Sequence, residues 1–244
     1  MRDHSLESWT IIGGGHAIHV LCPRYFVAIL KQILNGWTIQ PSDQTCVHEI
    51  SIRFDDENYT VDSIVLTKPV RHADLMNAVN EVLINFAYVI TALNQNILLL
   101  HCAGYCDGGL LNVVIGQKNR GKSSLMYQKA LGGQTIVADD LLLWHPKVGR
   151  FTALGLPLRL RRPVLDFNGT TANPAHFFAG NNIAYSKVNA FKMAKIGEIF
   201  LLDTLWELDD DYSPKKVSIL RAPSALKRFV IGDDFTTIVK TKVE

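Results

Sequence analysis

The stretch LLNVVIGQKNRGKSSL, residues 110–125, turns from an apolar run into a loop of small and basic residues. Its first part, residues 111–115, predicts a buried strand, and residues 123–130 predict a helix. Between them, residues 116–123 match the pattern G-x-x-x-x-G-K-[ST]. Glycines let backbone N–H groups converge on phosphate oxygens, and the start of a helix adds positive potential. The order of strand, loop and helix therefore predicts an α/β fold built around a phosphate-binding loop.

Within this loop, Lys122 is expected to reach the β- and γ-phosphates of a nucleotide, and the Ser123 hydroxyl is expected to bind Mg²⁺. Asn119 stands where such loops often have glycine, and asparagine tolerates left-handed backbone geometry better than most residues. Lys118 and Arg120 add charge that is either solvated or in contact with phosphate. The residues expected to contact the nucleotide are Gly116, Asn119, Arg120, Gly121, Lys122, Ser123 and Ser124.

An aspartate pair follows the helix. Residues 135–138 predict a short strand that ends in Asp139-Asp140, and residues 141–144 predict the strand that returns from this hairpin. Two carboxylates beside a phosphate-binding loop can have different roles, because one can bind Mg²⁺ while the other accepts a proton from an attacking hydroxyl. The alternative is a pair of surface turn residues. The chain has no N-K-x-D pattern, so the sequence does not indicate a GTPase.

The composition narrows the class of protein. The 244 residues are 48% hydrophobic, which is enough for a substantial core. A formal charge of +2 with a pI near 8.3 is nearly balanced, so no nucleic-acid partner is indicated. The first ten residues have no apolar signal segment, and the run at 82–100 carries too many Asn and Gln side chains for a membrane span. Four cysteines without a C-x-x-C pair fit reduced, mostly buried thiols, and we expect a cytoplasmic protein with no membrane partner.

Outside the loop, strands and helices alternate. Residues 8–20 and 47–66 contain short alternating apolar runs that predict strands. Helices are predicted at 25–34 and at 75–93, where apolar residues recur every three or four positions. The apolar runs at 97–100 and 110–115 are separated by an Asp-Gly turn, which indicates a hairpin. We therefore predict a small α/β region at residues 1–95 and a strand-rich catalytic domain at residues 96–244.

Two segments carry a resemblance to a known family: LLLHCAGYCDGGLLNVVIGQKNRGKSS, residues 98–124, and TIVADD, residues 135–140. They resemble the catalytic domain of the HPr kinase/phosphorylase family and its smaller relatives. That family has a histidine on the strand before its phosphate loop, and here His101 lies 15 residues before Gly116. It also has an aspartate pair after the helix, and here Asp139 lies 17 residues after Lys122. The segment GLPLRL at 155–160 is similar as well, so the resemblance covers roughly residues 97–162.

The resemblance implies a P-loop kinase core related to phosphoenolpyruvate carboxykinase, with a mixed, antiparallel-rich sheet. It implies transfer of the γ-phosphoryl group of ATP, with Mg²⁺, to a hydroxyl, usually a serine. In this chain Lys122 would stabilise phosphates, Asp139 would be the general base, and Asp140 would assist Ser123 with the metal. His101 would lie near the γ-phosphate or near Asp139. The sequence leaves open which aspartate is the base and which binds the metal.

The chain departs from the full family after residue 162, where we find no counterpart of the Gly- and Ile-rich loop associated with reverse phosphorolysis. The resemblance is therefore greater to the compact kinases encoded beside genes for ribosomally made peptides, in which the acceptor is a precursor-peptide hydroxyl. Two other functions stay open: a phosphotransferase for a small molecule such as an amino acid, and a non-catalytic nucleotide-binding module. Arg159 and Arg161, on one face of a predicted strand, are candidates for phosphate or acceptor contacts. Full-length relatives form hexamers, so the resemblance also implies self-association.

Overall fold

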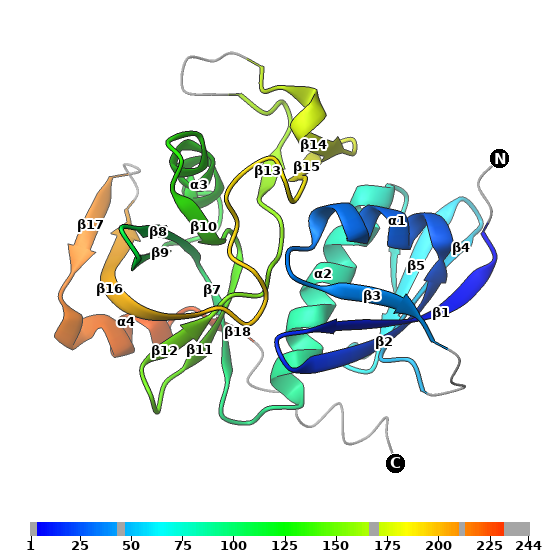
Figure 1. Cartoon of the computed structure of the whole chain (residues 1–244), viewed down its shortest axis with the longest axis horizontal. Coiled ribbons are helices and arrows are strands. Elements are labelled where there is room, and N and C mark those ends of the chain that lie inside the picture. The colour runs from blue at the N-terminus through cyan, green and yellow to red at the C-terminus, as the bar shows by residue number, and fades with distance from the viewer. Residues whose placement is uncertain (1–3, 43–46, 166–170, 210–212, 232–244) are drawn as a thin grey trace.

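The structure is a computed structural model that describes residues 4–42, 47–165, 171–209 and 213–231. Over these residues the protein is a strand-rich, mixed α/β fold in which the strands form three sheets (Figure 1). Most neighbouring strands in these sheets are antiparallel, so the expectation of a mixed, antiparallel-rich α/β protein is confirmed. The assignment to the P-loop kinase type stays a prediction.

The first sheet has six strands: β1 (Leu6–Gly13), β2 (His16–Pro23), β3 (Thr38–Pro41), β4 (Ile50–Asp55), β5 (Asn58–Ser63) and β6 (Val70–His72). Their order is β3-β1-β2-β4-β5-β6, in which β2 and β4 are parallel. The two helices predicted in this part of the chain are confirmed to within a residue, as α1 (Arg24–Ile33) and α2 (Leu75–Ala92). The Asp74 side chain caps α2 by accepting hydrogen bonds from the N–H groups of Met76 and Asn77, at 2.9 and 3.1 Å.

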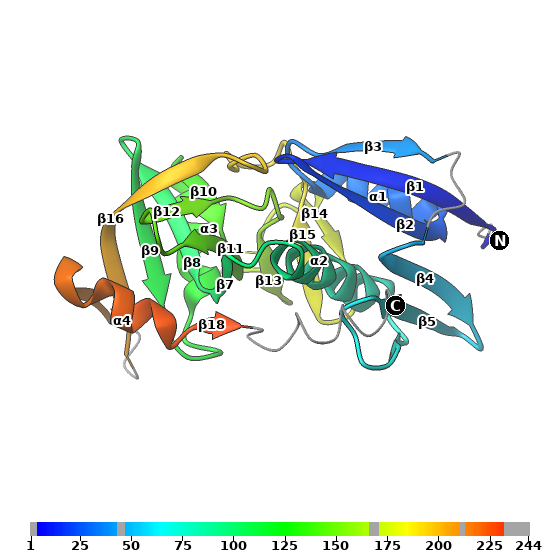
Figure 2. The ribbon, with the colours of Figure 1, turned by 90° about the horizontal axis from the view of Figure 1, so that it is seen from below.

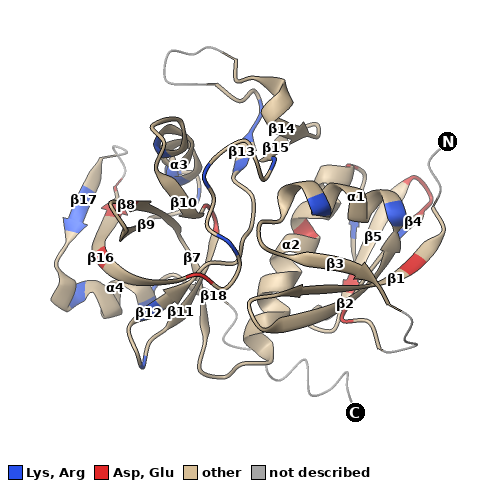
Figure 3. Ribbon diagram, viewed as in Figure 1, with Lys and Arg blue, Asp and Glu red and all other residues tan. Residues whose placement is uncertain are grey.

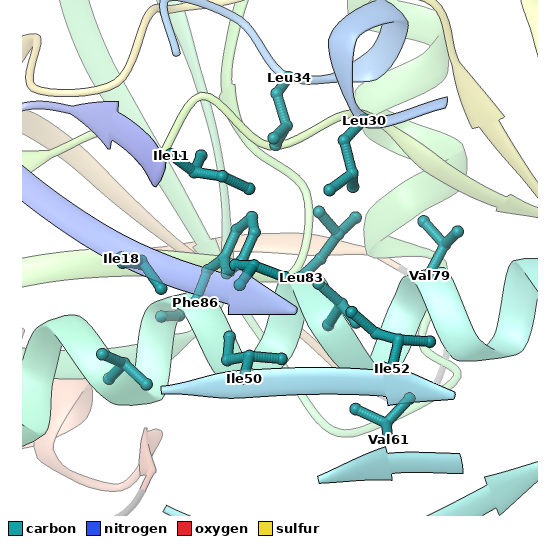
Figure 4. Packing of buried hydrophobic residues seen from close by; sticks show 14 of the residues in the cluster. Ile11, Ile18, Leu30, Leu34, Ile50, Ile52, Val61, Val79, Leu83 and Phe86 are labelled. Atoms are coloured by element: carbon teal, nitrogen blue, oxygen red, sulfur yellow. The ribbon is translucent and has the colours of Figure 1, made fainter. Parts of the chain in front are cut away.

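The main hydrophobic core lies between α1, α2 and the first sheet. Figure 4 shows Leu83 and Phe86 of α2 surrounded by side chains from α1, such as Leu30, and from the strands, such as Ile18 and Ile50. Phe86 is fully buried, as are Leu30, Ile50 and Val79. Complete burial of one such side chain contributes about 1.5–3 kcal/mol, so this core fixes the position of α2.

Helix α2 is long and apolar enough to cross a membrane by length and composition. In this fold, however, 56% of that helical segment is buried inside the protein. Asn85, near the middle of the helix, is fully buried and donates hydrogen bonds to the backbone oxygen and the side chain of Glu81, at 2.8 and 3.1 Å. The helix therefore packs as a core helix.

The second sheet has nine strands: β7 (Leu98–His101), β8 (Ala103–Asp107), β9 (Leu110–Ile115), β10 (Thr135–Ala138), β11 (Leu141–His145), β12 (Arg150–Thr152), β16 (Ile199–Leu208), β17 (Pro214–Val217) and β18 (Val230–Ile231). Their order is β10-β8-β9-β16-β12-β11-β7-β18, and β17 pairs with β16. β9 and β16 are parallel. The predicted helix after the loop is confirmed as α3 (Lys122–Leu131), which lies against β8 and β10 (Figure 2). A 3₁₀ turn, η2 (Ile219–Arg221), leads into α4 (Ala222–Lys227).

Two predicted hairpins are not formed in the structure, because their strands pair with other strands. The Asp-Gly turn at residues 107–108 joins β8 to β9, whereas the run at 97–100 becomes β7 and pairs with β11. β10 and β11 do not pair across the aspartate pair, because β10 pairs with β8 and β11 with β7 and β12. The predictions of hairpins between 97–100 and 110–115, and between β10 and β11, were therefore wrong. Both followed from pairing each strand with its nearest apolar neighbour in sequence.

A third, small sheet lies between the two halves. Its strands are β13 (Arg159–Arg161), β14 (Phe177–Ala179) and β15 (Ile183–Ser186), and η1 (Pro174–His176) precedes β14. Their order is β13-β15-β14. β13 contacts α3 and β15 contacts α2, so the small sheet connects the helix after the loop with the core helix of the first half (Figure 1).

The two halves are also joined directly. Asn35 donates its backbone N–H to Gly155 O at 2.8 Å and its side-chain amide to Met193 O at 2.6 Å. A Cβ atom on Gly155 would lie 2.2 Å from the Asn35 carbonyl oxygen, and its φ is +63°, so only glycine fits there. The main core includes Leu99 and Tyr185 from the second half. The division at residue 95 stays a prediction, since the core crosses it.

Candidate functional site

The predicted phosphate loop connects β9 to α3. Asn119 has a φ of +70°, so it adopts the left-handed conformation that asparagine tolerates. Gly121 is also left-handed, with φ +81° and ψ +10°, and serves as the N-cap of α3. Gly121 has no side chain that could cap the helix, and the described part of the chain shows no side-chain cap hydrogen bond at this helix start. An uncapped helix start preceded by a loop with left-handed residues is a ready anion site.

Lys122, the first residue of α3, is buried and turned back over the loop. Its ammonium donates hydrogen bonds to the backbone oxygens of Gly116, at 2.8 Å, and Gln117, at 3.1 Å. Burial lowers the pKa of Lys122, although the neighbouring carboxylates Asp140 and Asp139 partly oppose this. The lysine nitrogen therefore lies inside the loop, at the place where the sequence predicts a phosphate contact. Of the other predicted contacts, Ser124 is exposed and Arg120 is partly buried.

Strand pairing brings the aspartate pair to His101. β7 ends at His101, which lies opposite Leu141, the first residue of β11. Asp140 precedes Leu141 and therefore lies next to the histidine, and its backbone oxygen accepts a hydrogen bond from Cys102 N at 3.1 Å. Residues separated by almost 40 positions in the chain thus meet beside the loop.

Asp139 is the buried member of the pair, at 5% exposure. Its Oδ2 accepts a hydrogen bond from the backbone N–H of Arg159 at 2.8 Å, while its buried Oδ1 has no hydrogen-bond partner among the described residues. Burial raises the pKa of Asp139 to about 7, against the effects of the Arg159 N–H and the neighbouring Ser123 hydroxyl, which favour the charged form. A buried, unsatisfied carboxylate oxygen beside Ser123 is costly, and such groups are typical of sites that bind a cation or a substrate.

Asp140 is the accessible member, with a side chain that is 27% exposed. Its Oδ1 lies 2.9 Å from His101 Nε2, and its Oδ2 lies 3.2 Å from the Arg159 guanidinium. Burial alone would raise the pKa of Asp140, but His101, Arg159 and Lys122 together lower it. This carboxylate is therefore charged at neutral pH and held in one orientation by two side chains.

Two side chains that carry no sequence motif complete the network. Asn80 Oδ1, on α2, accepts hydrogen bonds from Arg159 Nη1 at 2.9 Å and from the Tyr185 hydroxyl at 2.7 Å. Asn80 thereby fixes the guanidinium that pairs with Asp140. No local pattern in the sequence points to these residues, because they come from a core helix and from the small third sheet.

Arg159 and Arg161, the two arginines of β13 predicted to contact phosphate or the acceptor, contact different parts of the site. Arg159 contacts the aspartate pair, whereas the exposed Arg161 donates a hydrogen bond to the side chain of Asn119 at the tip of the loop. Arg162 points elsewhere and donates to Gly180 O at 2.6 Å. The expectation that Arg159 and Arg161 lie on the same side agrees with these contacts, although contact with phosphate stays a prediction.

The residues present fit a Mg²⁺ ion that is bound together with a nucleotide. Among the described residues, no group of three or more His, Cys, Asp or Glu side chains could hold a metal alone. Mg²⁺ does not need such a group, since it commonly takes one or two protein ligands and completes its shell with phosphate oxygens and water. The Ser123 hydroxyl and the unpartnered Asp139 Oδ1 supply oxygen ligands of this kind.

Three of the four cysteines, Cys22, Cys102 and Cys106, are buried free thiols, as expected, and Cys46 lies outside the described residues. Burial raises the pKa of Cys102, which follows His101 directly. This thiol is therefore protonated at neutral pH and contributes packing rather than nucleophilic chemistry.

No family model matches the chain, and a search of curated proteins found no match. The resemblance to the HPr kinase/phosphorylase family therefore rests on the motif residues and their spacing. The geometry of the loop and the aspartate pair is the basis for inferring the function.

For the phosphoryl transfer that the family resemblance implies, Asn80→Leu is expected to lower kcat about tenfold with little change in the KM for ATP. The reason is that Arg159 loses the acceptor that orients it toward Asp140, and small misplacements in a site of this kind are costly. Asn80→Asp keeps an acceptor oxygen and should restore most of the rate. Asn77→Leu, one turn earlier on α2, is the matched control. If Asn77→Leu lowers kcat as much as Asn80→Leu, Asn80 only stabilises the fold.

Proposed function

We propose that this protein is an ATP-dependent kinase that transfers the γ-phosphoryl group to a hydroxyl, usually of serine, on a peptide or small protein. The observation that supports the proposal is the position of an aspartate pair beside the uncapped start of α3 and its lysine. The two aspartates differ in how deeply they are buried and in their partners. Asp139 is buried beside Ser123, and Asp140 is partly exposed and paired with His101. A loop that binds phosphate without chemistry would not require this second element.

The chain's residues have separate tasks in this reaction. The N–H groups at the start of α3 and the Lys122 ammonium bind the phosphates of ATP and stabilise the charge that develops on them. Mg²⁺, when bound, neutralises charge on the β- and γ-phosphates. Ser123 and Asp139 would hold it. The acceptor oxygen bonds to the γ-phosphorus as the bond to the bridging oxygen of ADP breaks, and the hydroxyl proton passes to a carboxylate.

The geometry favours Asp140 as the carboxylate that receives this proton, although the family resemblance implies Asp139. A base must meet an acceptor that arrives from solvent. Asp139 is 5% exposed and lies beside Ser123, whereas the side chains of Asp140 and His101 are 27% and 30% exposed. His101 and Arg159 orient Asp140 and leave it further lone pairs for the acceptor hydroxyl. Asp139, with its free oxygen near Ser123, is better placed for the metal.

The exposure of these side chains also supports a large acceptor. Asp140, His101 and Arg159 are each about 30% exposed, so the acceptor side of the site is open to solvent. An enclosed pocket would suit a free amino acid, because such a site must surround its ligand to bind it. A serine on a peptide segment can reach an open site while the rest of the peptide binds elsewhere.

Intact mass spectrometry tests the proposal. The protein is incubated with ATP, Mg²⁺ and serine-containing peptides, and in parallel with free serine. We expect a gain of one phosphate on a peptide serine, and no gain when EDTA is present. Phosphorylation of free serine alone would favour a small-molecule kinase, and ATP binding without transfer to either acceptor would favour a nucleotide-binding module.

A further inference from the structure

A large open groove adjoins the phosphate loop on the side that the proposed chemistry does not use. It measures about 1380 Å³, and its walls come from the start of the loop, the end of β16, the strand β17, and α4 with the residues after it. Gly116, Gln117 and Arg120 of the loop line it directly. The aspartate pair, His101 and Arg159 are not among its lining residues. The loop therefore has two sides: one faces the aspartates and the other faces this groove.

We propose that this groove holds the nucleoside part of the nucleotide, the base and the ribose, while its phosphates lie in the loop. This inference rests on the proposed function, because it assumes that the loop binds a nucleoside triphosphate. The γ-phosphoryl group must point toward Asp140 and the acceptor. The nucleoside, at the opposite end of the triphosphate, must then leave the loop on another side, and the groove begins at the loop itself.

The lining has the mixture of groups that a nucleoside needs. Val217, Leu208 and Phe229 provide apolar surface for a base, and the Ser218 and Ser224 hydroxyls can bond to ribose. Arg221, at the end of η2, and Lys216, on β17, add positive charge to the lining, and basic residues are visible on β17 in Figure 3. The volume exceeds the roughly 300–1000 Å³ of most small-molecule sites, so a nucleoside fits with room for water.

An acidic peptide is the competing occupant, and two carboxylates in the groove wall reduce the attraction for it. Asp209 pairs with Lys215 at 2.8 Å, and Glu207 pairs with Arg228 through both of its oxygens at 3.1 Å. These carboxylates lie in the groove wall, neutralise two of its cations and would repel an acidic segment. A neutral base and ribose meet no such repulsion.

The groove also connects to the acceptor side through the backbone. Phe229 lines the groove, and its carbonyl oxygen accepts a hydrogen bond from His101 N at 2.8 Å. The next residues form β18, which pairs with β7. A nucleoside packed on Phe229 would therefore brace the strand that carries His101.

The test compares two ligands, Mg²⁺·ATP and Mg²⁺·tripolyphosphate, which lacks the nucleoside. Ser224→Trp places a large side chain in the groove from an exposed position on α4. We expect its Kd for ATP to rise at least about tenfold, while its Kd for tripolyphosphate changes less than about twofold. Lys227→Trp, exposed on the same helix but outside the groove lining, is the matched control and should change neither affinity. Phe229→Ala, which removes contact surface instead of adding bulk, should also weaken ATP binding selectively.

The outcomes separate this inference from the proposed function. If both groove variants bind ATP as the wild type does, or lose both ligands equally, the nucleoside does not lie in the groove. If ATP binding is unchanged but transfer to a peptide is lost, the groove takes the acceptor, and the inference is overturned. If Lys122→Ala weakens neither ligand, the loop does not bind phosphate, and the proposed function itself fails.

Discussion

Asp140→Asn is expected to lower the rate of phosphoryl transfer about 10³-fold while leaving the Kd for Mg²⁺·ATP within about threefold of the wild type. Asparagine keeps the shape of the side chain and can still accept a hydrogen bond from His101. It cannot take up the proton of the acceptor hydroxyl. Single-turnover transfer to a peptide and titration with a fluorescent nucleotide measure the two quantities separately.

Asp139→Asn is the comparison that separates the roles of the two aspartates. If Asp139 holds the metal, its loss should raise the Mg²⁺ concentration needed for half-maximal transfer at least about tenfold, and excess Mg²⁺ should recover part of the rate. The opposite pattern, with Asp140→Asn active and Asp139→Asn inactive at every Mg²⁺ concentration, would assign the base to Asp139, as the family resemblance implies.

The stability of the Asp139→Asn variant at different pH values gives a second test, which does not depend on catalysis. Because burial raises the pKa of Asp139 from 3.8 in the unfolded chain to about 7 in the fold, the folded protein binds more protons between these values. Stability of the metal-free wild type should therefore fall as the pH rises from 4 toward 7 and stay low above it. Asp139→Asn has no such charge and should be more stable at pH 8, by on the order of a few kcal/mol, but not at pH 4. Urea unfolding in EDTA at both pH values measures this, and an equal effect at both would contradict the raised pKa.

Whether a feature of this site could be predicted depends on how far apart in the chain the residues that form it lie. The strand, loop and helix around Lys122 are local, so the residue pattern alone gave their order, and the left-handed conformation of Asn119 followed from the requirements of the loop. The helices α1 and α2 were likewise predictable, because their apolar periodicity is internal to each segment. Structure that depends on residues close together in the chain can therefore be predicted from the sequence.

Pairing between distant strands was not predictable in the same way. β7 pairs with β11 instead of forming a hairpin with β9, and that register sets His101 beside Asp140. Asn80 reaches Arg159 because α2 packs against β15, whereas Tyr185 lies opposite Arg159 in the pairing of β15 with β13 and donates its hydroxyl to Asn80. Neither residue belongs to a motif, since hydrogen bonds to one guanidinium impose no spacing along the chain. The spacing of His101 and the aspartates to the loop indicated a shared site, but not how the two carboxylates differ.

Lys122→Ala should have the largest effect on nucleotide binding: we expect the Kd for Mg²⁺·ATP to rise about 10–100-fold and kcat to fall about 10²–10³-fold. The ammonium is buried inside the loop, where a charge interacts with phosphate more strongly than it would in water. It also donates hydrogen bonds to the oxygens of Gly116 and Gln117, so its removal loosens the loop as well. Isothermal titration gives the affinity, and single-turnover transfer gives the rate.

The control for this substitution is Lys129→Ala, which removes the same side chain from the opposite end of α3. Lys129 lies over the ring of Tyr105, at 4.6 Å from its centroid, so its loss should cost a little stability and leave ATP affinity unchanged. Lys122→Met separates the two functions of Lys122, because it keeps the buried stem but removes the charge. If Lys122→Met binds ATP as tightly as the wild type, the lysine serves only to hold the loop, and the charge in the loop is not what binds the phosphates.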